Sequence, residues 1–163
     1  MNANTLLLGQ VNFADGILTQ GAQDLSDSEF LAQLPGPGQH ANWIFGHLAT
    51  TEDWLLSKLT SSSLELSEDV HSKYKAVPTL SAEASAFVPK SEVLALFKDQ
   101  RERTNAAIQG ADTATWDNPL PEGIPPQMGN IGGAWGLIGT HVFWHLGQLT
   151  AIRRMLGKPA LFS

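Results

Sequence analysis

Apolar residues recur along much of the chain at the spacing of an amphipathic α-helix, in which positions i, i+4 and i+7 share one face. This pattern predicts a first helix over residues 4–20. Similar patterns predict further helices over residues 39–59, 91–109 and 133–156. The apolar face of the first helix comprises Leu7, Val11, Ala14 and Leu18.

Polar segments rich in proline and glycine separate these patterns. Residues 35–38, Pro-Gly-Pro-Gly, are a loop signal, and residues 26–34 open with a capping-box sequence that favours a short helical turn. We interpret residues 60–90 and 111–132 as long connections, the first of which allows the helix after it to pack parallel to the helix before it. No segment has convincing strand alternation, so we expect an all-α four-helix bundle.

Composition and charge narrow the class of protein. The chain has 163 residues, enough to bury a core as one domain, 1–163, and it contains no cysteine. Its net charge is −6 and its first lysine or arginine is Lys58, so it lacks the basic stripe of a nucleic-acid-binding protein. The missing cysteines exclude disulfides, thiolate metal sites and a cysteine nucleophile. The N-terminus lacks the basic region of a signal peptide, and we expect a cytoplasmic protein.

Two long windows, residues 31–51 and 123–152, contain no Asp, Glu, Lys or Arg. Their length raises the question of a membrane span. Prolines and glycines interrupt both windows, so we interpret them as buried helices and expect no membrane partner. Four of the five histidines lie in these windows: His40, His47, His141 and His145.

Two of these histidines lie four residues apart. Because an α-helix advances about 100° per residue, His141 and His145 share one face, and Gln148 lies on that face one turn later. His47 faces an inward stripe of the second predicted helix. Its neighbours on that stripe are Trp43, Thr51 and Trp54. Two interpretations fit: polar core residues that satisfy one another, or three imidazole ligands of one metal ion.

Other polar residues have simpler interpretations. We expect His40 to be a helix-start residue and His71 to be exposed to solvent in a polar loop. Glu52 and Asp53 point away from the histidine face of their helix, so no carboxylate is forced into the cluster. Arg101 falls near the inner stripe of the third helix, where it either pairs with a carboxylate or reaches a ligand.

Three residues are candidates for substrate binding or for supporting metal ligands. Gln148 either hydrogen-bonds a metal-bound water or substrate, or makes an interhelical hydrogen bond. Trp43 and Trp54 either line a mostly apolar pocket, as in small-molecule sites, or pack in the core. The sequence assigns no residue a catalytic role.

Two short motifs, residues 42–48 (NWIFGHL) and 141–149 (HVFWHLGQL), resemble those of the DinB/YfiT-like family of metal-dependent proteins. The resemblance also covers the helix order and both long connections. It implies a four-helix bundle, often dimeric, in which a histidine of the second helix and a His-x-x-x-His pair of the fourth bind a divalent metal. Transferred to this chain, the ligands are His47, His141 and His145.

Three neutral imidazoles leave a divalent ion its full charge and at least one open coordination position. Imidazole suits zinc, nickel and iron, and also copper, so the sequence does not name the metal. The resemblance implies chemistry on a small molecule, either thiol transfer or isomerisation with a low-molecular-weight thiol, or hydrolysis. The alternatives are a non-catalytic, stress-related metal- or ligand-binding protein and a bundle that keeps the histidines only as core residues. An apolar outer face, for which Trp144 is a candidate, would support a homodimer.

Overall fold

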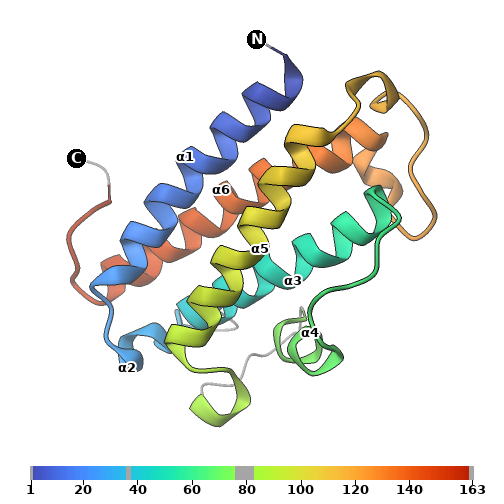
Figure 1. Ribbon diagram of the computed structural model, residues 1–163. Coiled ribbons are helices and arrows are strands. Elements are labelled where there is room, and N and C mark those ends of the chain that lie inside the picture. Colours follow the sequence, from blue (N-terminus) through green and yellow to red (C-terminus); the bar gives the residue numbers. More distant parts are fainter. Residues whose placement is uncertain (1, 36–37, 76–82, 162–163) are drawn as a thin grey trace.

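The computed structural model describes residues 2–35, 38–75 and 83–161, and within these ranges the protein is helical with no β-strand. The expected all-α fold is therefore confirmed. The long helices are α1 (Ala3–Gln23), α3 (Ala41–Leu59), α5 (Lys90–Gly110) and α6 (Ile131–Met155) (Figure 1). The shorter helices are α2 (Asp27–Phe30) and α4 (Glu68–Tyr74), with 3₁₀ turns η1 (Ala84–Ala86), η2 (Thr113–Thr115) and η3 (Pro126–Met128).

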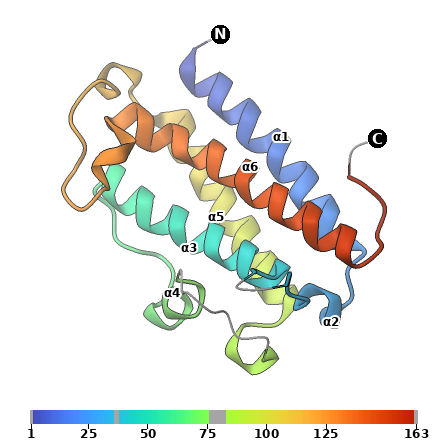
Figure 2. The same ribbon diagram turned by 180° about the vertical axis from the view of Figure 1, so that it is seen from behind.

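The long helices form two parallel pairs. In the first pair, Phe45 and Glu52 of α3 meet Phe97 and Arg101 of α5 in the same order along both helices. In the second pair, α1 runs parallel to α6, which lies beside it in both views (Figures 1 and 2). The two long helices of the first pair, α3 and α5, are joined by the long connection that contains α4. This connection runs back along the bundle, so α5 can start beside the start of α3 and pack parallel to it, as predicted.

The two pairs are antiparallel to each other and meet along two seams. At the α3–α6 seam, Trp43 lies against His145 and His47 lies against His141, in opposite order along the two helices. At the α1–α5 seam, Asp15 pairs with Arg101, and Asn12, one turn earlier on α1, accepts from Asn105, one turn later on α5. Each seam therefore joins helices from different pairs.

Local sequence explains where the helices begin. The Asn2 side chain accepts from the Thr5 backbone amide at the start of α1, and Asn130 caps α6 in the same way. The predicted capping box is present at Ser26, whose hydroxyl and Glu29 cap α2 reciprocally. His40 is the N-cap of α3, where its Nδ1 accepts from the Trp43 amide at 3.0 Å, so its expected helix-start role is confirmed.

The apolar faces meet in two adjoining core clusters. All four stripe residues predicted for α1 are buried, and α3 contributes Ile44, Phe45, Leu48 and Leu55. α6 covers residues 131–152 of the second charge-free window. No helix in the described ranges is long and apolar enough to cross a bilayer. The uncharged residues of α3 and α6 are therefore explained by the burial of these helices against their neighbours.

The connection between α3 and α5 holds an element that the periodicity misses. α4 is a seven-residue helix whose N-cap is Ser67, and it packs on α3. Its interpretation as irregular connection is wrong, because about two helical turns are too short to display a periodic apolar stripe. It is held by one fully buried side chain, Tyr74.

Candidate metal centre

Three imidazoles converge at the α3–α6 seam. One nitrogen from each of His47, His141 and His145 can be chosen so that all three atoms lie within 4.8 Å of one another. The His141 and His145 ring centroids are 4.5 Å apart, and the His47 ring lies 5.1 Å from His141 and 5.2 Å from His145. The four-residue spacing of His141 and His145 on α6, together with the antiparallel packing of α3 on α6, brings the three rings close together. The cluster could hold a metal ion.

Hydrogen bonds orient two of the three rings. His47 Nδ1 donates to the Tyr74 backbone carbonyl at 3.0 Å, which leaves Nε2 with its lone pair. His145 Nδ1 lies 2.6 Å from the Gln148 side-chain oxygen, and its Nε2 lies 2.9 Å from Nε2 of His141. Outer hydrogen bonds of this kind fix the tautomer of metal-ligating histidines.

The surroundings keep the cluster uncharged. Burial lowers the pKa of His141 to about 3, with further contributions from the neighbouring His145, His47 and Arg101. Burial also lowers the pKa of His145 to about 4 and shifts the pKa of His47 downward. Neutral imidazole is the form that binds a metal, so at neutral pH no proton has to be displaced from a charged ring.

Tryptophan and glutamine side chains enclose the cluster. The Trp43 indole stacks on the His47 ring with centroids 4.2 Å apart and planes inclined by 10°, and its edge faces His145. Gln148 also donates from Nε2 to the side-chain oxygen of Gln39 at 3.1 Å, so it both holds His145 and crosses the seam. Of the alternatives weighed for Gln148, the interhelical hydrogen bond is therefore present.

Beside the cluster lies a small pocket of about 220 Å³. It is bounded by α3 on one side and by α4 on the other. Trp54 is half-buried, and it both lines this pocket and packs against one of the core clusters. The full lining is His47, Thr50, Thr51, Trp54, His71, Tyr74 and Lys75. A candidate metal ligand thus faces space that a small molecule can enter.

Tyr74 and Gly46 support the site, and sequence reasoning missed both. A Cβ atom at residue 46 would lie 2.3 Å from the Tyr74 ring, so only glycine lets α4 approach α3 this closely. The Tyr74 hydroxyl donates to the Asn42 side-chain oxygen at 3.0 Å and accepts from the Val88 amide at 3.3 Å. The glycine in the segment 42–48 was the available signal, because a helix-interior glycine is unfavourable unless something packs against it.

His71 is not a solvent-exposed loop residue, and that expectation was wrong. It lies on α4 with its side chain 22% exposed, and its Nε2 is 2.9 Å from the Asp53 carboxylate. Asp53 also accepts from the amides of Glu65 and Leu66, both at 3.1 Å. The buried carboxylate needs partners, and it obtains them by drawing the connection and α4 onto α3.

Glu52, like Asp53, does not take part in the histidine cluster, as its helical position predicted. Its carboxylate pairs with Arg101 Nη2 at 2.6 Å, while Arg101 Nε pairs with Asp15 at 2.6 Å. Carboxylate pairing, one of two interpretations of Arg101, is therefore what the structure shows. The interior of the bundle therefore contains charged side chains as well as apolar ones.

The fold and the cluster define a class of protein: an all-α bundle of four long helices with three histidines gathered between two of them. The chain matches the family model of the DinB superfamily over residues 14–149, and it belongs to that superfamily. The matched range contains all three histidines, and the resemblance carried by the two short motifs is confirmed. A comparison with curated protein sequences gives no match.

Proposed function

We propose that this protein binds one divalent metal ion through His47, His141 and His145 and uses it to act on a small molecule. The observation that carries the proposal is the convergence of three neutral imidazole donors within 4.8 Å. Closed structural sites take four protein ligands, whereas three leave a position for a ligand from outside. Zinc, nickel and iron all suit this donor set.

When bound, the ion supplies Lewis-acid chemistry towards water, thiols and carbonyl groups. The chain itself orients the donors, through Tyr74 for His47 and Gln148 for His145. Trp43 covers one face of His47 and excludes water from that side. In the adjoining pocket, His71 and Lys75 are polar groups that can orient a substrate.

Two reaction types fit the site, thiol transfer and hydrolysis. The chain has no cysteine, so the nucleophile of a thiol transfer comes from an external low-molecular-weight thiol. The pocket of about 220 Å³ favours a small substrate fragment. A non-catalytic metal- or ligand-binding protein is the second candidate, since within the described ranges no carboxylate joins the histidine cluster to serve as a base.

The test begins with elemental analysis of protein purified without a histidine tag and incubated with zinc, nickel or iron. We expect about one equivalent per chain for wild type, and a large loss of affinity in His141→Ala and His145→Ala. His71→Ala is the matched control, because His71 lies in the pocket but outside the cluster. Equal losses in all three variants, or less than about a tenth of an equivalent in wild type, would refute the site.

Catalysis needs a separate measurement. A panel of thiol–electrophile pairs and activated esters is assayed with metal-loaded and metal-stripped protein. Turnover that requires the metal and is lost in His145→Ala supports an enzyme. A protein that binds metal tightly and turns over none of these substrates supports the binding-protein candidate.

We extend the proposal to the assembly and setting of the protein. Phe13 and Phe143 lie 6.5 Å apart on the α1–α6 pair, and Trp144, which follows Phe143 on α6, is 71% exposed. Burial of these rings against a second copy would explain their exposure. We infer a homodimer of one-domain chains, 1–163, in the cytoplasm, in keeping with the cysteine-free composition.

A further inference from the structure

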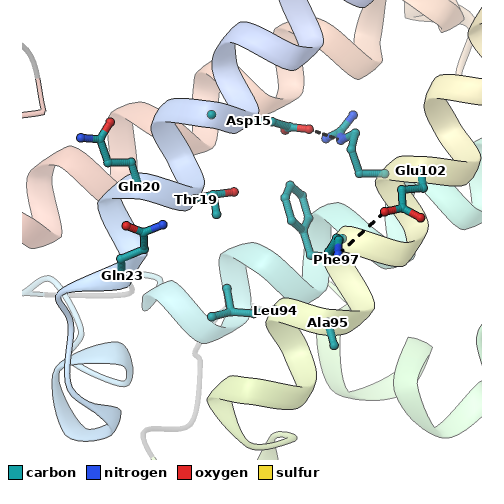
Figure 3. Close-up of a pocket in the computed structure, with 11 residues that line it drawn as sticks. Asp15, Thr19, Gln20, Gln23, Leu94, Ala95, Phe97 and Glu102 are labelled. Atoms are coloured by element: carbon teal, nitrogen blue, oxygen red, sulfur yellow. Dashed lines mark ion pairs between the residues drawn. The ribbon is translucent and has the colours of Figure 1, made fainter.

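A second cavity lies at the α1–α5 seam, on helices that supply none of the three histidines. Its volume is about 600 Å³, in the range of small-molecule sites (Figure 3). The residues that line it are all on α1 or α5, and they do not include the metal-site residues. The cavity, called here the α1–α5 groove, is therefore separate from the proposed metal centre.

The lining of the groove is mostly apolar. Phe97 and Leu94 come from α5, and Thr19 faces them from α1 (Figure 3). Gly16 leaves room on the α1 side, because a Cβ atom there would meet no atom within 4 Å. The groove thus offers apolar contact for the body of a ligand.

At the inner side of the groove is a buried ion-pair cluster. The Arg101 side chain is 7% exposed, and its Nε lies 2.6 Å from Oδ2 of Asp15. Its Nη2 lies 2.6 Å from Oε1 of Glu52, whose other oxygen accepts from the Thr104 hydroxyl at 2.9 Å. The guanidinium also lies 5.3 Å from the centre of the Phe97 ring. Charged groups from α1, α3 and α5 therefore meet behind the apolar lining.

The charges of this cluster do not balance. Two carboxylates face one guanidinium, so with both acids ionised the cluster carries a charge of −1. Glu52 is paired with Arg101 at Oε1, which makes no hydrogen bond, and accepts from Thr104 at its other oxygen. Asp15 lines the groove, and its Oδ1 is buried with neither a hydrogen bond nor an ion pair. Burial and the Glu52 charge together raise the pKa of Asp15 to about 7, against the lowering effect of the Arg101 charge. A cation that enters the groove would supply the donor that Oδ1 lacks.

The remaining charges do not supply that donor. At the edge of the groove, Lys98 and Glu102 lie 4.0 Å apart, and both are at least 70% exposed. Nη1 of Arg101 also lacks a hydrogen-bond partner and would attract an anion. An anion would nevertheless meet two carboxylates around a single guanidinium, so charge complementarity favours a cation.

We propose that the α1–α5 groove binds a small organic amine, with its ammonium group at Asp15 and its apolar body against Leu94 and Phe97. The ammonium donates to the unpartnered oxygen of Asp15 and balances the cluster. The apolar lining selects an amine with an aromatic or aliphatic body over a bare inorganic cation. This site does not depend on the proposed metal function.

The test is a titration of zinc-loaded protein with 2-phenylethylamine, followed by calorimetry and by two-dimensional NMR. Two analogues of similar shape serve as comparisons, the neutral 2-phenylethanol and the anionic 3-phenylpropionate. We expect the amine to shift amide signals of α1 and α5 and to bind about tenfold or more tightly than either analogue. Tighter binding of 3-phenylpropionate would overturn the proposal in favour of an anion site at Arg101.

Two substitutions locate the binding. Asp15→Asn keeps the shape and removes the charge, and we expect it to weaken amine binding by about tenfold or more. Gly16→Leu fills the groove and should abolish binding. Its control is Gly9→Leu, two turns earlier on the same face of α1, where a Cβ also meets nothing within 4 Å and which does not line the groove.

Amines also coordinate metals, so the titration is repeated with His145→Ala and with metal-stripped protein. If the amine affinity is unchanged in both of these proteins, the ligand binds in the groove, whether or not the metal proposal holds. Loss of binding in His145→Ala, equal binding to Asp15→Asn, or no amide shifts at millimolar amine would each refute the inference. Circular dichroism spectra and melting curves establish that each variant is folded.

Discussion

The backbone carbonyl of Tyr74 accepts a hydrogen bond from His47, and the ring of the same tyrosine fills the space above Gly46. A candidate metal ligand is thus oriented by a residue whose position depends on the absence of a neighbouring side chain. Gly46→Ala places a Cβ 2.3 Å from the Tyr74 ring, so α4 must move and His47 loses its acceptor. We expect metal affinity to fall roughly 10–100-fold, as for other losses of outer hydrogen bonds.

Competition with a chromophoric chelator measures this loss. Gly147→Ala is the matched control, because it adds the same methyl group on α6, where a Cβ meets nothing within 4 Å. If Gly46→Ala and Gly147→Ala bind zinc equally well, the Tyr74 contact does not orient His47.

Gln148 plays the corresponding part for His145. Gln148→Leu removes the oxygen that lies 2.6 Å from Nδ1, and we expect metal affinity to fall by roughly 10–100-fold. Gln148→Glu keeps an acceptor at that position and should retain the affinity. Gln39→Leu should have the smaller effect, since Gln39 reaches the histidine only through Gln148. The same competition assay gives all three values, and equal losses in the Leu and Glu variants would contradict the proposed role.

The histidine cluster predicts a loss of stability in acid for the metal-free protein. Burial lowers the pKa of His141 to about 3 and that of His145 to about 4, so between these values and 6.5 the unfolded chain binds more protons than the folded chain. Stability contributed by the neutral rings is therefore lost as the pH falls from 6.5 towards 4. As the pH falls over this range in thermal melts, the Tm of wild type should decrease more than that of His141→Gln. The extra decrease should be about 2–4 °C for each kcal/mol lost from the free energy of unfolding.

For Asp15 we predict that stability changes with pH in the opposite direction. Burial raises its pKa from 3.8 to about 7, so between these values the folded chain holds a proton that the unfolded chain has released. Its contribution to stability therefore falls as the pH rises from 4 to 7. As the pH rises from 4 to 7, the Tm of wild type should therefore fall relative to that of Asp15→Asn. A difference in Tm that does not depend on pH would show that the acid stays ionised.

The exposed rings of Phe13, Phe143 and Trp144 predict self-association. Trp144→Glu places a charge at the most exposed of these rings, and we expect it to convert the dimer into a monomer in sedimentation velocity experiments. Leu64→Glu is the control, because Leu64 is also exposed but lies outside α1 and α6. A wild-type protein that sediments as a monomer at high concentration would rule out the homodimer.

Much of the fold follows from local pattern. Each of the four long helices begins within two residues of its predicted start, because a sustained apolar stripe marks a helix. Capping side chains at Asn2, His40 and Asn130 also mark three of these starts. The predicted end of α1 at residue 20 is three residues early, because the helix continues through Gly21 to Gln23. This glycine lies against Leu149 and Leu161.

The site was predictable only in part, for a physical reason. Spacing on one helix places His141 and His145 together, and the inward direction of His47 follows from its apolar neighbours. The contacts of Asp53 with His71 and of Tyr74 with His47 join residues from different elements, so no periodicity encodes them. The Asp15–Arg101–Glu52 cluster likewise draws on three helices whose spatial order the sequence does not state.

The two seams have a mechanical consequence. Among the long helices that the structure describes, the α1–α6 pair and the α3–α5 pair meet along these two seams, and His47 lies on one pair while His141 and His145 lie on the other. An ion shared by the three would act as a cross-link between two halves of the molecule, opposing any sliding of one half past the other. The ion pair between Arg101 and Asp15 joins the two halves at the opposite seam, so polar groups link them on both sides of the bundle.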